Sequence, residues 1–404
     1  MSNFALNRNE FFFVVLIVKK KYDYIIAGGG CAGLSLAWHM MHRKELKDKE
    51  ILIIDRVTKS ENDRTWCFWE KENGPFEAIV EHRWEQAWFH TNGFSKLLDL
   101  KPYWYKMIRA DRFYIYIKTH LATFPNIHWL EAEVLNCDSG DYSAFVETGN
   151  GEFEGDWVFT SIVPKVLPKP GYHYLLQHFT GWMVKTKEPA FDPAQPTLMD
   201  FRVDQKEDCR FMYILPVSAT EALVEYTLFS ADLLEKRDYE LALELYLKDN
   251  LKISEYEITH KEFGVIPMYS EPFEKFPANN VVQIGTSGNQ TKPSTGYTFT
   301  RIQKHSEWIC HSLADKDKRV ISPQPKPSRF HFYDRIFLHV LAKEKIPGAR
   351  IFESLFRKNK PKEVFQFLDE DTNFWKEYRL LNTVPIFKFI GPAFKEIWKM
   401  WKVF

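Results

Sequence analysis

The hydrophobic pattern at the start of the chain predicts a strand, a helix and a second strand. Residues 22–27 form a mainly apolar run, and a glycine turn separates them from a segment with helical spacing at about residues 32–42. Residues 50–55 contain the apolar run Ile-Leu-Ile-Ile. This order predicts a βαβ unit at the beginning of a parallel sheet.

The middle of the chain changes to short alternating segments. Strand-like runs cover residues 197–203, 210–215 and 222–229, and their links are short and polar or contain proline. Residues 281–285 again have the pattern of a buried strand that leads into a glycine-rich loop. After about Arg301 the amphipathic stretches and scarce turn signals indicate helices. We therefore expect an α/β protein with a Rossmann-like fold, an inserted, mostly antiparallel sheet and a helical C-terminal region.

These changes of pattern place the expected domain boundaries. Residues 22–160 and 260–305 would form a discontinuous dinucleotide-binding domain, 161–259 the inserted substrate-binding sheet, and 306–404 the C-terminal helices. We expect residues 1–21 to be an unstructured extension. Their apolar run, Phe11 to Val18, is much shorter than the roughly 20 residues that span a bilayer.

The composition argues against several classes of function. The 54 basic and 54 acidic residues give a formal net charge of zero, whereas a nucleic-acid partner usually requires a basic excess. The five cysteines include no Cys-x-x-Cys pair, and the thirteen histidines form no recognisable metal motif, so we expect no metal. Aromatic residues make up 16% of the chain, which suits either a phenylalanine-rich core or an aromatic-lined pocket for an apolar ligand.

The glycine turn after the first strand has the spacing of a dinucleotide-binding motif. Gly28, Gly30 and Gly33 fit Gly-x-Gly-x-x-Gly. The first glycine allows the tight turn, the second allows close approach of the pyrophosphate, and the third allows the helix to pack on the strand. Asp55 ends the second strand, where a carboxylate can bind ribose hydroxyls. NAD and FAD share this motif, so it does not choose between them.

Five further segments resemble the lycopene cyclase family of FAD-fold proteins, and they occur in the family's order. The segments are Arg64–Trp69 (RTWCFW), Met199–Arg202 (MDFR), Tyr213–Ser218 (YILPVS), Leu223–Thr227 (LVEYT) and Pro293–Tyr297 (PSTGY). The resemblance extends from about Tyr22 to the C-terminal region. Two positions depart from the family pattern: Tyr226 stands where many relatives carry a second carboxylate, and Thr286 stands where many FAD-fold enzymes have aspartate.

The resemblance implies a flavin-dependent carotenoid cyclase of the isomerase class. Its substrates would be lycopene and other linear carotenes, and lycopene would become β-carotene through γ-carotene by acid-catalysed ring closure without net redox change. The implied cofactor is FAD in its reduced form, which would stabilise the carbocation, and NAD(P)H is one candidate reductant. Two alternatives remain open: an FAD-dependent polyprenyl or carotenoid oxidoreductase or hydroxylase, and a carotenoid-binding protein without activity.

An acid that protonates an alkene must stay protonated at neutral pH, and burial of a carboxyl group achieves this by raising its pKa. Glu225 is the first candidate for this acid. Alternation places Leu223, Thr227 and Phe229 on its face of the strand, and the other face is also apolar, so we expect the strand to be buried. The alternative is a core glutamate paired with an arginine such as Arg202.

Asp200 is the second candidate acid. It shares a strand face with Arg202, which predicts an ion pair and an ionised carboxylate with a positioning role. Aromatic faces could stabilise the cation. The candidates for this are Trp66, Trp69, Tyr213 and Tyr226.

Other residues are expected to contact the flavin. The loop after the buried strand would bring its backbone close to a flat ring. The resemblance also implies an arginine near the cofactor, for which a plain surface arginine is the alternative. The candidates are Gly285, Gly288, Pro293, Gly296 and Tyr297 in the loop, and Arg112 elsewhere. The acidic run 369–371 has no partner carboxylates for a metal, and we interpret it as a solvated helix cap.

A membrane surface is the remaining expected partner, because lycopene is too apolar to cross water. Residues 385–404 mix aromatic residues with lysine, as interfacial segments do. We expect Gly391-Pro392 to break this segment and residues 393–404 to form a helix. The protein would be cytoplasmic and would lie peripherally on the inner face of the cell membrane. A helix docked on the protein's own core is the alternative.

Overall fold

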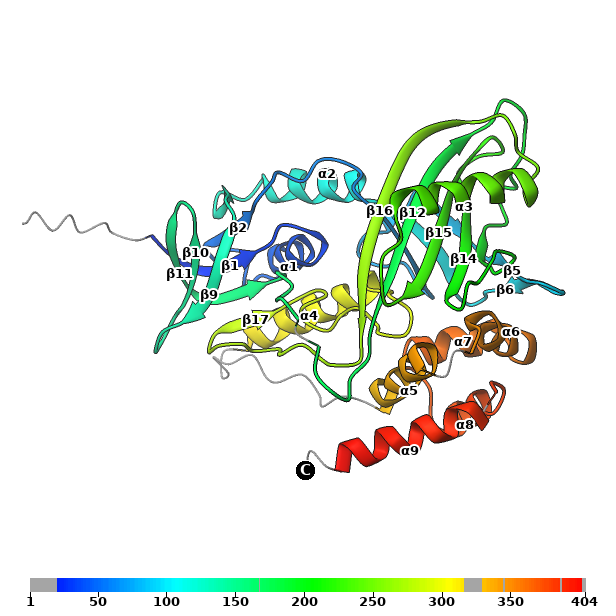
Figure 1. The fold of residues 1–404 in the computed structure, drawn as a ribbon. Helices are drawn as coiled ribbons and strands as arrows, with labels where there is room; N and C mark the ends of the chain where they lie inside the picture. Colours follow the sequence, from blue (N-terminus) through cyan, green and yellow to red (C-terminus); the bar gives the residue numbers. More distant parts are fainter. Residues whose placement is uncertain (1–19, 167, 316–328, 344–345, 386, 402–404) are drawn as a thin grey trace, which may run out of the picture.

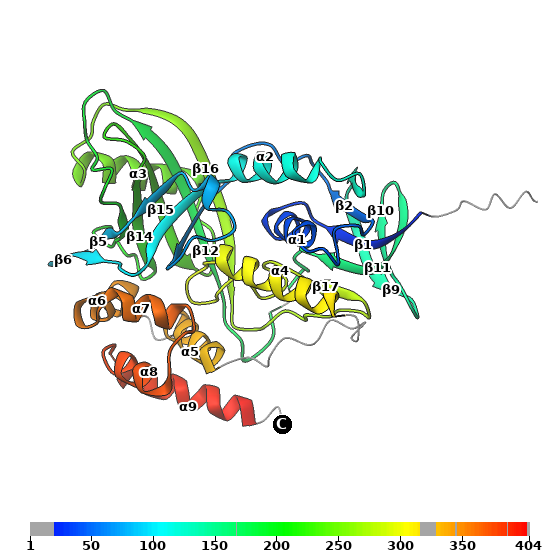
Figure 2. The ribbon, with the colours of Figure 1, turned by 180° about the vertical axis from the view of Figure 1, so that it is seen from behind.

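The computed structural model describes residues 20–166, 168–315, 329–343, 346–385 and 387–401. A mainly parallel sheet lies at one end, a mainly antiparallel sheet at the other, and the C-terminal helices lie along one side of the second sheet (Figures 1 and 2). Most of the expected N-terminal extension, residues 1–19, falls outside the described residues. Lys21 already begins the first strand.

The first sheet confirms the βαβ unit. Its strand order is β8-β2-β1-β11-β10-β9, with β17 beside β11. The strands are β1 (Lys21–Ala27), β2 (Ile51–Asp55), β8 (Ile127–Glu131), β9 (Val134–Ser139), β10 (Ala144–Thr148), β11 (Gly151–Thr160) and β17 (Val281–Gln283). Strand β1 runs parallel to β2 and β11. Helices α1 (Cys31–Met41), α2 (Ala110–Leu121) and α4 (Phe299–Ala314) contribute to the core beside this sheet.

The second sheet has the order β16-β12-β15-β14-β13-β5-β6. Its strands are β5 (Gln86–Thr91), β6 (Phe94–Asp99), β12 (Tyr174–Lys185), β13 (Thr197–Asp200), β14 (Cys209–Pro216), β15 (Glu221–Ser230) and β16 (Glu257–Tyr269). The sheet thus includes β5, β6 and most of β16, which lie outside the expected range 161–259. Strand β5 joins through a parallel pairing with β13, a long-range contact that no local pattern encodes.

A small third sheet connects the two larger ones. It has the order β3-β7-β4 and consists of β3 (Thr65–Glu70), β7 (Trp104–Arg109) and β4 (His82–Trp84), with the short 3-10 helix η1 (Glu77–Ile79) beside them. Strand β3 carries residues 65–69 of the RTWCFW segment, whose side chains pack into the cores beside both larger sheets.

Helices cover both faces of the second sheet. Helix α3 (Lys236–Asp249) packs Tyr239, Leu243 and Tyr246 on the face that carries Val224 and Tyr226. The C-terminal helices cover the opposite face, the one with Leu223 and Phe229. They are α5 (Arg329–Lys343), α6 (Gly348–Lys358), α7 (Pro361–Leu368), α8 (Phe374–Leu381) and α9 (Phe387–Trp401).

Helix α9 corrects the expectation of a break at Gly391-Pro392. It runs without interruption from Phe387 to Trp401 with Pro392 inside it. A proline near the start of a helix removes one backbone hydrogen bond. Pro392 and Glu396, one turn later, are both buried, and α9 packs against α5. This packing offsets the lost bond.

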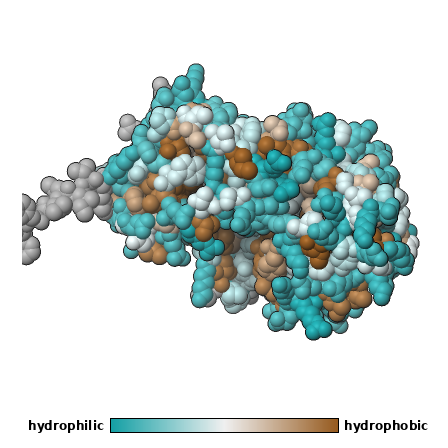
Figure 3. Space-filling model, turned by 90° about the horizontal axis from the view of Figure 1, so that it is seen from above, coloured by the Kyte–Doolittle hydropathy of each residue, from teal (hydrophilic) through white to brown (hydrophobic). Residues whose placement is uncertain are grey.

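Hydrophilic side chains predominate on the face shown in Figure 3, and hydrophobic ones form scattered patches there. Within the described ranges, no helix has the length and apolar character that crossing a bilayer requires.

Candidate functional site

A cavity of about 590 Å³ lies where the first sheet, the second sheet and β3 meet. Its lining includes the glycine turn after β1, the loop after β17, and side chains of β3, β14, β15 and β16. Segments that are far apart in sequence, and that were expected to bind the cofactor or to supply the acid, therefore border one space.

The glycine turn borders the cavity in the way the motif requires. Gly28 and Gly30 line it, and Gly30 stands at the start of α1 with no side-chain cap. A Cβ at Gly28 would come within 2.1 Å of Ser161 Oγ, and one at Gly33 within 2.0 Å of the Gly28 carbonyl oxygen. Asp55 also lines the cavity, and its carboxylate accepts a 2.7 Å hydrogen bond from the Gly29 N–H.

The loop after β17 forms the opposite wall. Gly285, Gly296 and Tyr297 line the cavity, and both glycines have positive φ angles, 62° and 73°. Gly288 and Pro293 are not among the lining residues. A Cβ at Gly288 would lie 2.4 Å from the Gln283 carbonyl oxygen, so this glycine serves the close packing of the turn.

Two buried polar atoms beside Gly296 lack hydrogen-bond partners among the described residues. They are Gln177 Oε1 and Thr295 Oγ1, and both residues line the cavity. Because an unpaired buried polar atom costs about 1–3 kcal/mol, the pair indicates a site for polar groups of a ligand.

Arg112 lies away from this space. It is an exposed residue on α2 and is absent from the cavity lining. The arginine that the cavity does contact is Arg64, immediately before β3. The RTWCFW segment contained that residue, but sequence gave no reason to prefer it.

Glu225 occupies the position predicted for the acid. It lines the cavity from β15, and Thr227 Oγ1 donates a 2.6 Å hydrogen bond to its Oε1. Burial is the largest cause that raises the pKa of Glu225, to about 8, and the neighbouring carboxyl of Glu262 raises it further. Arg202 is not its partner, because that guanidinium binds Asp200.

Glu262 on β16 is the functional candidate that sequence reasoning missed. Strand β12 separates β15 from β16, and Gly181 of β12 stands in register with both Glu225 and Glu262. The side chain of Glu262 is buried, and burial raises its pKa. Strand pairing across a glycine is the signal that could have revealed this pair, but local alternation does not contain it.

Of the four aromatic residues expected to stabilise a cation, two line the cavity and two do not. Trp66 and Tyr213 line the cavity. The hydroxyl of Tyr297 lies 3.1 Å from that of Tyr105, another lining residue. Trp69 points elsewhere and donates a 2.6 Å hydrogen bond to Asp369.

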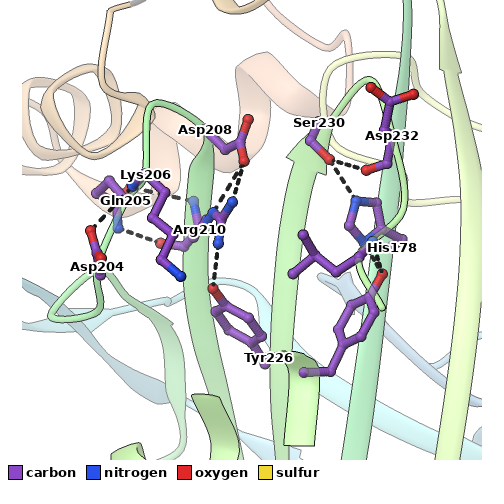
Figure 4. A network of polar contacts seen from close by, with 11 residues as sticks. His178, Asp204, Gln205, Lys206, Asp208, Arg210, Tyr226, Ser230 and Asp232 are labelled. Atoms are coloured by element: carbon purple, nitrogen blue, oxygen red, sulfur yellow. Dashed lines mark hydrogen bonds and ion pairs between the residues drawn. The ribbon is translucent and has the colours of Figure 1, made fainter. Parts of the chain in front are cut away.

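Tyr226 is also outside the cavity. Its hydroxyl accepts a 3.3 Å hydrogen bond from Arg210, which is paired with Asp208 (Figure 4). On a neighbouring part of the same face, His178 contacts Ser230 at 2.6 Å and Tyr239 at 2.5 Å. Tyr226 therefore takes part in packing and polar contacts beneath α3, on the opposite face from Glu225.

Asp200 has the ion pair predicted for it. Its Oδ2 lies 2.6 Å from the Arg202 Nη2 and accepts a 2.5 Å hydrogen bond from the Tyr246 hydroxyl. These hydrogen bonds outweigh the desolvation and hold the pKa of Asp200 below its usual value. The residue is fully buried and does not line the cavity. The structure therefore gives it contacts that stabilise the sheet and α3.

The acidic run 369–371 follows the end of α7 but is not simply solvated. Glu370 Oε1 lies 3.1 Å from Lys292 Nζ and 2.9 Å from Arg301 Nη1, and Asp371 lies 3.1 Å from Lys71. The run fastens the C-terminal helices to the loop after β17. These partners are more than 60 residues away in sequence, so the pattern could not show them.

Three buried residues of types that can bind metals lie close together, although no sequence motif indicated this cluster. His173, His339 and Glu396 bring one ligand atom each within 4.8 Å of one another. Hydrogen-bond distances of 3.3 and 3.2 Å join the histidines to Glu396 Oε1, and Arg335 Nη2 lies 2.7 Å from Oε2. These contacts connect α9 with α5 and the segment before β12.

Comparison with known proteins assigns the family. The family model described as lycopene cyclase protein matches residues 23–390. This chain belongs to the lycopene cyclase family. It is 28% identical over 220 residues to a lycopene beta-cyclase of Pseudescherichia vulneris, covering 52% of each protein. It is 24% identical over 304 residues to a chloroplastic neoxanthin synthase of Solanum tuberosum, covering 70% of this chain and 58% of that protein. The chain thus spans somewhat over half the length of these relatives.

Solved structures share the fold of this lycopene cyclase family member. A geranylgeranyl bacteriochlorophyll reductase-like protein of Thermoplasma acidophilum superposes with a TM-score of 0.59 at 10% identity, covering 90% of this chain and 96% of that one. A variant of HpxO from Klebsiella pneumoniae, complexed with FAD, gives 0.55 at 14% identity, covering 90% and 100%. The predicted α/β flavoprotein fold with an inserted sheet is therefore confirmed.

Proposed function

We propose that this protein is a lycopene β-cyclase, which closes the ends of lycopene to give β-carotene through γ-carotene. The observation that carries the proposal is the position of Glu225: a carboxyl group with a raised pKa lines the cavity that the glycine turn also borders. Family membership supports the substrate class, because relatives are named lycopene beta-cyclase.

The chemistry requires a proton donor inside an apolar enclosure. Glu225 would donate its proton to the terminal double bond, so that the O–H bond breaks and a C–H bond forms. The neighbouring double bond then attacks the tertiary cation, and the new ring loses one proton. Trp66 and Tyr213 line the same space, where an aromatic face could stabilise a cation by about 0.5–2 kcal/mol.

FAD fits the residues present. Gly28, Gly30 and the uncapped N-terminus of α1 would hold the pyrophosphate, and Asp55 the ribose. The unpaired atoms of Gln177 and Thr295 would meet polar edges of the flavin ring beside Gly296. When bound in its reduced form, the flavin would supply negative charge near the cation. NAD(P)H is a candidate reductant.

An FAD-dependent polyprenyl reductase is the second candidate, favoured by the fold shared with the reductase-like protein of Thermoplasma acidophilum. Expression in a lycopene-accumulating bacterial host, followed by pigment chromatography and mass spectrometry, separates the two. A cyclase gives cyclic products with the mass of lycopene. A product two hydrogens heavier or lighter would support the oxidoreductase, and unchanged lycopene would contradict both.

A membrane surface is the proposed source of the carotene, with the protein peripheral on the cytoplasmic face. Helices α8 and α9 expose large apolar side chains: Phe374, Trp375, Tyr378, Ile390 and Phe394. Glu396 on α9 is buried against α5, so this helix docks on the protein with one side and exposes another. Residues 402–404, which include the aromatic Phe404, lie outside the described residues, and so do the side chains of residues 397–401.

A further inference from the structure

The geometry points to Glu225 and Glu262 acting as one unit, a carboxyl–carboxylate pair across Gly181 that shares a single proton. Glu225 carries the proton toward the cavity, and Glu262 is a positioning residue behind it. The catalytic role of the pair rests on the proposed function, whereas the existence of the pair can be tested without it.

Strand register brings the two side chains together. Gly181 pairs with Glu225 on one side and with Glu262 on the other, so all three positions point to the same face of the sheet. Strands two apart are separated by roughly 10 Å, a gap that two glutamate side chains can bridge only if the middle residue leaves room. A Cβ at Gly181 would lie 3.0 Å from Glu262 Cγ and 3.2 Å from its Oε1.

The hydrogen bonds around the pair leave one carboxylate oxygen of Glu262 available as an acceptor for the Glu225 proton. Thr65 Oγ1 donates to Glu262 Oε2 at 2.9 Å. Glu262 Oε1, the atom beside Gly181, has no hydrogen-bond partner among the described residues. Burial raises the pKa of both carboxyls, and the neighbouring Glu262 raises that of Glu225 further. Because Glu225 is the one that lines the cavity, the shared proton belongs on Glu225.

Other titratable groups around the pair do not replace this interaction. Cys67 on β3, Tyr213 on β14 and Tyr297 in the loop face Glu225, and burial raises the pKa of each well above neutrality, so all three are uncharged. Arg64 and Asp63 face Glu262 and act in opposite directions on its pKa. The negative charge closest to Glu225 is therefore that of Glu262.

The pair explains how one acid can act in both proton steps. When Glu225 gives up its proton, two adjacent carboxylates remain, Glu262 buried and Glu225 half-buried in the cavity wall, an arrangement that favours taking a proton back. The proton released from the new ring restores the starting state. Atoms and charges balance, and no other reactant is required.

Infrared titration of the purified, substrate-free protein tests the pair without using activity. A protonated carboxyl gives its own C=O absorption band, and Glu225 should contribute a component that is present at neutral pH in the wild type and missing in Glu225→Gln. In Glu262→Gln the band should titrate at least about one pH unit lower, which is tenfold weaker proton affinity. Glu262→Asp keeps the charge and should shift the midpoint less.

Gly181→Ala provides an independent variant that leaves both acids in place. Its new Cβ presses on Glu262, so the midpoint should also move to lower pH. An unchanged midpoint in Glu262→Gln, or a carboxyl absorption at neutral pH that Glu225→Gln leaves undiminished, would overturn the inference. If the band behaves as stated but no carotene is cyclised, the proposed function fails and the pair stands.

Discussion

The pH dependence of cyclisation follows directly from the surroundings of Glu225. A carboxyl with the ordinary pKa of 4.5 would be protonated in only about 0.3% of molecules at pH 7. With a pKa of about 8 it is protonated in roughly 90% at pH 7 and in about 10% at pH 9. The environment thus supplies about a 300-fold larger population of active acid at neutral pH.

The assay is the initial rate of ring closure on lycopene in liposomes, with reduced flavin held constant, between pH 5 and 10. We expect a nearly constant rate up to about pH 7, half of it near pH 8, and a tenfold loss per unit above that. Flavin content measured at each pH is the control. A rate that already falls tenfold per unit from pH 5 upward would show that the acid is unperturbed and would refute the reasoning.

The same shift has a consequence for stability. A carboxyl whose pKa is raised on folding binds more protons in the folded state, so the free energy of unfolding decreases as pH rises from 4.5 to about 8. The shift limits this loss to about 5 kcal/mol. Glu225→Gln should therefore unfold at a higher temperature than the wild type at pH 9, and at a similar temperature near pH 4.

Three further substitutions test the remaining parts of the account. Gly33→Ala should abolish flavin binding, measured as visible flavin absorbance per protein, because its Cβ would lie 2.0 Å from the Gly28 carbonyl oxygen. The control is Gly149→Ala, whose Cβ meets no atom within 4 Å and which should keep the flavin. Asp200→Asn should lower the free energy of unfolding by about 1.5–3 kcal/mol while the folded enzyme keeps its pH profile, since Asp200 binds Arg202 and Tyr246 outside the cavity; a shifted pH profile would give it a role in the chemistry. Phe394→Glu should weaken co-sedimentation with anionic liposomes, while Leu135→Glu, at another exposed position, on β9, should not. Equal binding by both variants would contradict an anchor on α9.

Local patterns were sufficient for the elements that depend on neighbouring residues. The βαβ unit, the glycine turn and the alternation that turns Glu225 toward the cavity all follow from spacings of a few residues. The ion pair between Asp200 and Arg202 could also be predicted, because residues two positions apart on a strand point to the same face.

Features that depend on distant strands could not be obtained in this way. Glu262 meets Glu225 only because β12 lies between their strands with a glycine in register. Strands β5 and β6 enter the second sheet through a contact with β13 about 110 residues later. Likewise Pro392 predicted a helix break, but packing on α5 decided the outcome.

If Glu225 delivers the proton that starts ring closure, turnover must depend on its acidic proton, and Glu225→Gln removes that proton alone. Glutamine keeps the size of the side chain but has no acidic proton. The account predicts that the variant folds, keeps its flavin and forms no detectable cyclic carotene from lycopene at any pH. Formation of β-carotene near the wild-type rate by a folded, flavin-loaded variant would contradict it.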